Sequence, residues 1–158
     1  MIYTPLTKKA MRIAFDAHKD QVDKTGLPYI FHPFHLAEQM TDEISVCAAL
    51  LHDVAEDSDM SFEELKSQGM PDEIIDTLRL LTHDDATPYM DYAQKIKGSG
   101  NKTAVAVKLA DLRHNSDVTR LDAIDDKMIA RLEKYRAAIE LLTEDIFQQR
   151  RGFIIGSN

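Results

Sequence analysis

Apolar residues recur every three or four positions along most of the chain, the spacing that places them on one face of an α-helix. The first such segment begins at the capping residues Thr4 and Thr7 and is expected to end by Gln21. Gly26 and Pro28 then break the pattern, which predicts a loop around them. No segment alternates with the period of two that is typical of a strand. The pattern therefore predicts an all-α, compact multi-helix fold.

The later helices are delimited by the same kinds of signal. Ser61 and Glu64 form a capping-box pattern, and Gly69 follows at the position of a helix end. Further helices are expected over 33–40, about 42–56, 61–69, 71–81, 88–98, 103–115 and 128–142. We expect these helices to form one domain over residues 1–148, with a C-terminal tail over residues 149–158.

Length and composition are those of a single globular domain. With 158 residues, of which 44% are hydrophobic, the chain is long enough to bury a core. It has no N-terminal basic-then-apolar signal segment, and no apolar run approaches the roughly 20 residues that a membrane span needs. Cys47 is the only cysteine, so no internal disulfide can form. These features predict a cytoplasmic protein with no membrane partner.

The formal net charge of −8 narrows the class of ligand. Binding to nucleic acid depends on Lys and Arg side chains that neutralise phosphates, and an acidic chain is a poor candidate for it. Small anions remain candidates, because a local basic pocket can exist in an acidic protein. Self-association is left open, since nothing in the sequence fixes a number of subunits.

The segment Cys47–Asp57, CAALLHDVAED, places charge in the least polar part of the chain. On one continuous helix, His52 would lie beside Glu56, and Asp53 beside both Glu56 and Asp57. Burying an ionised group without a partner costs several kcal/mol, and a divalent cation would neutralise these carboxylates. The alternative is that Glu56 and Asp57 are solvated at the helix end and that His52 is a core histidine.

Two other segments carry candidate ligands. His32 directly precedes the helix-opening Pro33 in YIFHPFHL, and Asp111 follows an apolar run in VKLADLRHNSD. Taken separately, His32 is interpreted as a cap or surface residue, and Asp111 as a structural hydrogen-bond acceptor. Read together with the His52–Asp53 pair, they suggest one metal site built from three segments. Two imidazoles and two carboxylates, without cysteine, suit Mn²⁺ with open coordination positions more than a closed structural zinc site.

The order of these residues resembles the ligand set of the HD metal-dependent phosphohydrolase superfamily. The surrounding sequence segments GLPYIFHP, LHDVAEDS and VKLADLRHN resemble more specifically the hydrolase domain of the RelA/SpoT family, particularly its small stand-alone members. The resemblance covers roughly Ala17 to Leu121. It implies an all-helical, manganese-dependent enzyme that removes the 3′-pyrophosphate from guanosine tetra- or pentaphosphate, (p)ppGpp, the alarmones of the stringent response.

The resemblance also implies roles for individual residues. The implied metal ligands are His32, His52, Asp53 and Asp111. Glu56 and Asp57 match the acidic pair that acts near the attacking water, and either can be the base. Asn115 matches a residue that contacts the sugar of the nucleotide, and Lys24 lies in a loop that covers base and phosphates. Lys24, Lys108 and Arg113 are further candidates to steady phosphates, and His114 is a candidate to support a metal ligand.

Two positions depart from the family pattern. Asp23 stands where the family commonly has an arginine that stacks on guanine, and Val118 stands where it often has a threonine. Aspartate cannot stack on a base and would repel phosphate. Two alternatives therefore remain beside the alarmone hydrolase: an HD phosphohydrolase for another nucleotide or phosphorylated metabolite, and a binding module without turnover.

Overall fold

The computed structural model describes residues 1–121 and 123–155, with side-chain surroundings for 1–121 and 123–144. Its elements are α1 (Pro5–His18), α2 (Phe31–Glu38), α3 (Glu43–Leu51), α4 (Val54–Asp57), α5 (Phe62–Ser67), α6 (Asp72–Leu81), α7 (Tyr89–Gly98), α8 (Lys102–Asn115), the 3₁₀ turn η1 (Val118–Arg120) and α9 (Asp126–Ile155). No strand forms among these residues, which contain one isolated β-bridge, between Val22 and Pro28. The predicted all-α fold is confirmed.

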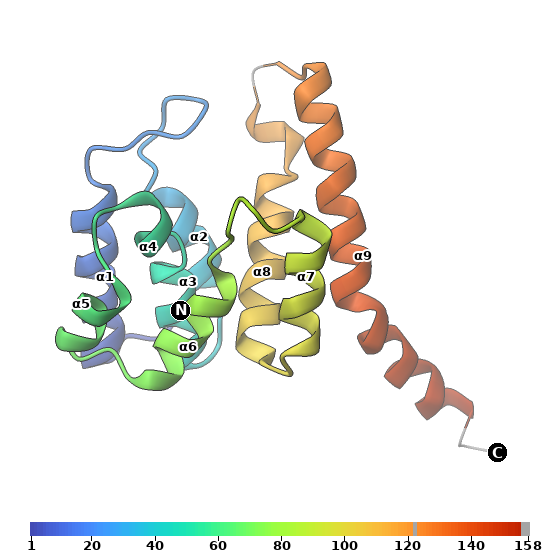
Figure 1. Ribbon diagram of the computed structural model, residues 1–158, viewed down its shortest axis with the longest axis horizontal. Coiled ribbons are helices and arrows are strands. Elements are labelled where there is room, and N and C mark those ends of the chain that lie inside the picture. The colour runs from blue at the N-terminus through green and yellow to red at the C-terminus, as the bar shows by residue number, and fades with distance from the viewer. Residues whose placement is uncertain (122, 156–158) are drawn as a thin grey trace.

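The centre of the molecule is α3, which is apolar on all sides. Its residues 45–51 are all buried, Cys47 among them. A helix without a polar face must be covered all round, and α1, α2, α6 and α8 pack against it. Helix α8 in turn contacts α7 and α9, which lie on the side of α8 away from α3 in Figure 1. Together α3 and α8 join the two halves of the core.

The expected helix over 42–56 is interrupted, and the prediction of one continuous helix is wrong. Helix α3 ends at Leu51, and the short α4 begins at Val54. Between them His52 and Asp53 form a turn, with Asp53 at φ −95° and ψ −6° as the N-cap of α4. The two adjacent side chains meet, with Nε2 of His52 3.0 Å from Oδ2 of Asp53.

The predicted helix starts are confirmed where a capping residue marks them. Thr4 caps α1 and Ser61 caps α5, each in a capping box with the third helical residue. Helix α1 ends at His18, three residues earlier than expected, and a loop follows to Ile30. In this loop Gly26 has φ +81°, a left-handed conformation that glycine adopts without strain. The loop is held by bonds from the Asp23 N–H to the Leu27 carbonyl at 2.8 Å and from the Tyr29 N–H to the Gln21 carbonyl at 2.9 Å.

The last helix is longer than the sequence pattern predicts. Helix α9 continues across residue 148 to Ile155, and in Figure 1 its C-terminal part extends beyond the other helices. Residues 156–158 lie outside the described part of the chain. The division into a domain and a tail at residue 148 stays a prediction. Among the described residues, no helix combines the length and the apolar character needed to cross a membrane.

Candidate metal centre

Three segments that are far apart in the sequence bring predicted ligands to one point. His32 lies in the first turn of α2, Asp111 lies on α8, and His52 and Asp53 form the turn between α3 and α4. Nε2 of His32 lies 3.3 Å from Oδ1 of Asp111 and 3.6 Å from Oδ2 of Asp53. Nε2 of His52 lies 3.0 Å from the same Asp53 oxygen. His32, His52 and Asp53 each offer a ligand atom, all within 4.8 Å of one another, which is a group able to hold a metal ion.

The hydrogen bonds of His52 test whether a metal fits here. Its Nδ1 lies 2.9 Å from the carbonyl oxygen of Ala49, which can only accept, so Nδ1 donates. Nε2 is then the ring nitrogen left to bind a cation when the imidazole is deprotonated, and this buried atom has no hydrogen-bond partner. Its contact with Asp53 lies outside hydrogen-bonding geometry. A buried ring nitrogen without a hydrogen-bond partner, next to two carboxylates, is a position that a cation fits.

The electrostatics of the site also favour positive charge. Burial lowers the pKa of the His52 imidazole, but the carboxylates of Asp53 and Asp111 outweigh it and raise that pKa to about 9. Burial works against ionisation of Asp53 as well, yet His52 lowers its pKa to about 2. The pKa of Asp111 is lowered in the same way, chiefly by Lys108. The site thus keeps two ionised carboxylates in the interior, which is the donor set that a hard divalent cation prefers.

Lys108 pairs with Asp111, one of the predicted metal ligands, and does not line the cavity next to the candidate metal centre. Its Nζ lies 2.8 Å from Oδ2 of Asp111, and the two side chains are 13% and 9% exposed. The ammonium group also lies over the rings of Tyr92 and Tyr89, 5.2 and 5.8 Å from their centroids. Arg113, the other cation considered for phosphate on α8, is exposed and lines a separate groove. Of the three cations considered, Lys24 alone lines the cavity next to the metal centre.

Two residues hold the candidate ligands through contacts that the sequence analysis did not predict. The Tyr29 hydroxyl donates to Oδ2 of Asp53, and its ring packs 5.1 Å from that of the buried His18. The Asn115 amide donates to Oδ1 of Asp111. Each of these bonds fixes a carboxylate oxygen beside the predicted metal position. The aromatic residue in GLPYIFHP is visible in the sequence, but no local pattern reveals that it contacts Asp53.

The predicted acidic pair lies on α4, exposed at the edge of the centre. The carboxylate of Glu56 accepts a bond from the backbone N–H of His83, which ties it to the segment after α6. The carboxylate of Asp57 has no hydrogen bond within the described residues. Burial raises the pKa of both groups, and the negative charge of Asp53 adds to the effect. A raised pKa brings a carboxylate closer to the range useful for accepting a proton.

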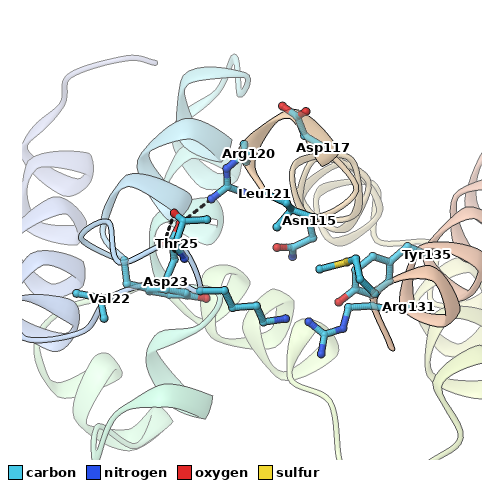
Figure 2. Close-up of a pocket in the computed structure, with 12 residues that line it drawn as sticks. Val22, Asp23, Thr25, Asn115, Asp117, Arg120, Leu121, Arg131 and Tyr135 are labelled. Atoms are coloured by element: carbon cyan, nitrogen blue, oxygen red, sulfur yellow. Dashed lines mark hydrogen bonds and ion pairs between the residues drawn. The ribbon is translucent and has the colours of Figure 1, made fainter. Parts of the chain in front are cut away.

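A cavity of about 300 Å³ lies beside the centre (Figure 2). The predicted substrate residues Lys24 and Asn115 both line it, so the structure brings them together. Arg131 and Tyr135 face it from α9, on the side opposite the loop that carries Lys24. These two residues, one helical turn apart on a predicted helix, were not among the sequence candidates. Their contribution depends on the packing of α9 against α8, which local sequence does not reveal.

Asp23, the first departure from the family pattern, is neutralised by its own surroundings. Its Oδ1 accepts bonds from the N–H of Thr25 at 2.8 Å, the hydroxyl of Thr25 at 2.7 Å and the N–H of Leu27 at 3.1 Å. Its Oδ2 lies 2.9 Å from Nη2 of Arg120. The carboxylate therefore stabilises the loop and pairs with a cation, which weakens the expected repulsion of phosphate. Val118, the second departure, lies exposed in η1, beyond the end of α8.

Several known proteins are similar in sequence to this chain. A Haemophilus influenzae protein named guanosine-3′,5′-bis(diphosphate) 3′-pyrophosphohydrolase is 35% identical over 115 residues, covering 65% of this chain and 17% of its own length. An Aquifex aeolicus protein of the same name is 43% identical over 39% of this chain and 9% of its own length. A Myxococcus xanthus GTP pyrophosphokinase is 30% identical over 80% of this chain and 18% of its own length. The chain thus spans less than a fifth of the length of these relatives.

A solved structure matches nearly the whole chain. It is that of a metazoan ortholog of SpoT, described as hydrolysing ppGpp and playing a role in starvation responses. The match has a TM-score of 0.64 at 25% identity and covers 95% of this chain and 98% of the other. No protein-family model matches the chain.

Proposed function

We propose that this chain, an HD-domain protein similar to the RelA/SpoT hydrolases, removes the 3′-pyrophosphate from (p)ppGpp with the help of a divalent cation, Mn²⁺. The observation that carries the proposal is the buried, unpartnered Nε2 of His52, which faces the same point as His32 and Asp53. That point lies beside a cavity lined by cationic and aromatic side chains. The names of the relatives and of the matching solved structure supply the reaction and the substrate.

The proposed metal ligands are His32, His52, Asp53 and Asp111. When bound, the cation supplies a Lewis acid that lowers the pKa of water and offsets charge on the phosphoryl oxygens. Nδ1 of His52 donates to the Ala49 carbonyl, which leaves Nε2 as the ring nitrogen that would bind the cation. Tyr29 holds one carboxylate in place through its hydroxyl group.

We assign the proton transfer to the α4 carboxylates. Water attacks the phosphorus attached to the ribose 3′-oxygen, the bond between that phosphorus and that oxygen breaks, and pyrophosphate leaves while the ribose keeps a 3′-hydroxyl. Asp57 is the better candidate to accept the proton from the water, because its carboxylate is free of hydrogen bonds within the described residues. Glu56 is anchored to the His83 N–H and is better placed to orient the water. The proton is then passed to the leaving 3′-oxygen.

The cavity is proposed to hold the nucleotide. Lys24, from the loop after α1, and Arg131, from α9, both line the cavity and offer cationic groups to phosphates. Tyr135 offers an aromatic face to the base or sugar. Asn115 lines the cavity while its amide donates to Asp111, so a contact with the sugar would be transmitted directly to a ligand.

A second candidate function is hydrolysis of another nucleotide by the same centre. The observation in its favour is Asp23, since the guanine-stacking arginine of the family pattern is absent from this loop position. The metal ligands and the acidic pair would act unchanged. The difference between the two candidates therefore concerns recognition of the base alone.

The test is to incubate metal-free protein, with and without Mn²⁺, with ppGpp and a panel of common nucleotides, and to separate products by ion exchange. Mn²⁺-dependent formation of GDP and pyrophosphate from ppGpp supports the proposal. Turnover of a different nucleotide alone supports the second candidate. The His52→Ala variant serves as the inactive control. If the wild-type protein turns over nothing in the panel, the proposed reaction is rejected.

A further inference from the structure

The metal-site residue His32 has a second ring nitrogen, and its partner is another histidine. Nδ1 of His32 lies 2.6 Å from Nδ1 of His114. The ring planes differ by 22° and the centroids lie 4.8 Å apart, so the two nitrogen atoms are much closer than the ring centres, as in rings that meet edge to edge. At this distance one nitrogen must donate and the other accept, because two lone pairs or two N–H groups would repel each other.

Arg120 contacts the same nitrogen of His114. Its Nη1 lies 3.1 Å from Nδ1 of His114 and 3.2 Å from the His114 backbone carbonyl oxygen. Its Nη2 donates to Oδ2 of Asp23 at 2.9 Å. The guanidinium group is thus fixed between the loop after α1 and the end of α8, and Figure 2 shows it reaching toward Asp23.

A guanidinium group decides the direction of this chain of bonds. Arginine carries donors only and is not deprotonated in proteins, so Nδ1 of His114 must present a lone pair to it. With that lone pair facing Arg120 and His32, the hydrogen between the two histidines must sit on Nδ1 of His32. A neutral His32 then carries its lone pair on Nε2, the atom that faces Asp53 and Asp111.

We propose that Arg120 is a positioning residue that, through His114, keeps His32 in the tautomer able to bind a cation. The inference rests on the metal centre of the proposed function, and it adds a role for residues of η1 and of the loop. Because Asp23 holds the other end of the guanidinium, the nucleotide-facing loop and His32 are joined by one continuous series of bonds, from Asp23 to Arg120, His114 and His32.

In this arrangement Asp23, the departure from the family pattern, serves as the anionic anchor of Arg120. The loop position carries the anion, and the cation reaches it from η1, 97 residues away in sequence. The guanidinium lies at the wall of the cavity next to Lys24 and Asn115. Substitution of Asp23 is therefore expected to loosen the loop and to release one of the two anchors of Arg120.

The first test reads the tautomers directly in metal-free, full-length protein with ¹⁵N-labelled histidine. Long-range ¹H–¹⁵N spectra should show Nδ1 protonated in His32 and unprotonated in His114. In Arg120→Met this difference should be lost for His114, whereas Arg113→Met, an exposed arginine on the neighbouring helix, should leave it unchanged. A protonated Nδ1 of His114 in the wild-type protein overturns the inference without any variant.

The second test measures Mn²⁺ affinity by calorimetry. Loss of groups that orient metal ligands typically weakens binding 10- to 100-fold, so Arg120→Met should bind about tenfold more weakly. Arg113→Met should stay within about twofold of wild type, and Arg120→Lys, which also can only donate, should recover part of the loss. Equal affinity of the Arg120→Met and Arg113→Met variants overturns the inference. Failure of wild-type protein to bind Mn²⁺ instead rejects the proposed metal centre, and the spectra of metal-free protein still decide the tautomers.

Discussion

The buried pair of Lys108 and Asp111 provides a prediction that needs no metal and no substrate. The Asp111→Asn substitution removes the carboxylate whose Oδ2 lies 2.8 Å from Nζ of Lys108 in the wild-type protein. The ammonium group of Lys108 is then left in the interior without an ionic partner. Breaking one partner of a buried ion pair typically costs 3–5 kcal/mol. The rings of Tyr89 and Tyr92 still cover the ammonium, so we take the lower limit. We expect the free energy of unfolding to fall by about 3 kcal/mol.

Thermal and urea unfolding of the metal-free protein in a chelator measure this loss. For a chain of this length, 1 kcal/mol corresponds to roughly 2–4 °C, so the midpoint should fall by about 6–12 °C. The matched control is Asp76→Asn, which removes an ion pair of the same i,i+3 spacing with Arg79 at 3.6 Å. Because Asp76 is 71% exposed, that loss should be close to zero.

The double variant Lys108→Met with Asp111→Asn separates charge from shape. Removing both charges leaves no unpaired ion, so most of the stability should return, although the metal site is lost. If Asp111→Asn is no less stable than Asp76→Asn, the reasoning about the buried pair is refuted. If the double variant is as unstable as Asp111→Asn alone, the loss comes from packing instead of the stranded ammonium group.

Three further predictions concern the proposed centre. In metal-free protein the pKa of His52 is raised from 6.5 to about 9, which contributes stability on the order of 3 kcal/mol. This contribution should be fully present below pH 6.5 and lost as the pH rises toward 9. Urea unfolding across that pH range measures the loss, which should be absent in His52→Gln. Mn²⁺ at about 100 times its dissociation constant should stabilise the wild-type protein by about 2.7 kcal/mol, measured as a rise in melting temperature. If both His52→Ala and Asp53→Ala keep that rise, the ligand assignment is contradicted. Glu56→Gln and Asp57→Asn should keep metal binding by calorimetry while hydrolysis slows by about 100-fold, and unchanged turnover in both would remove them from the mechanism.

The sequence predicts helices well where local chemistry sets them. Thr4 and Ser61 cap the helices they were expected to cap, because a side-chain oxygen beside free N–H groups is a local interaction. The interruption after Leu51 was not predicted. Residues 52 and 53 include no glycine or proline, so nothing local marks the turn, and the backbone there is set by packing of α3 and α4 against their neighbours.

The site follows the same division between local and distant interactions. His32, His52, Asp53 and Asp111 were identified because their order resembles that of a known family. The structure brings them within a few ångströms of one another. The Asp23–Arg120 pair was beyond prediction, since residues 97 positions apart meet only after the loop and η1 are placed. Asp23 was therefore expected to repel phosphate, whereas its charge is satisfied inside the protein.

The buried thiol of Cys47 can report on opening of the folded protein. The thiol lies fully buried on α3, five residues before His52, and burial raises its pKa to about 12. A thiol reagent needs the exposed thiolate, so labelling can proceed only when the centre of the core opens. As the chain has a single cysteine, the labelling rate measures that opening without any engineered probe. Occupancy of the proposed metal centre should therefore be readable as slower modification of one sulfur atom.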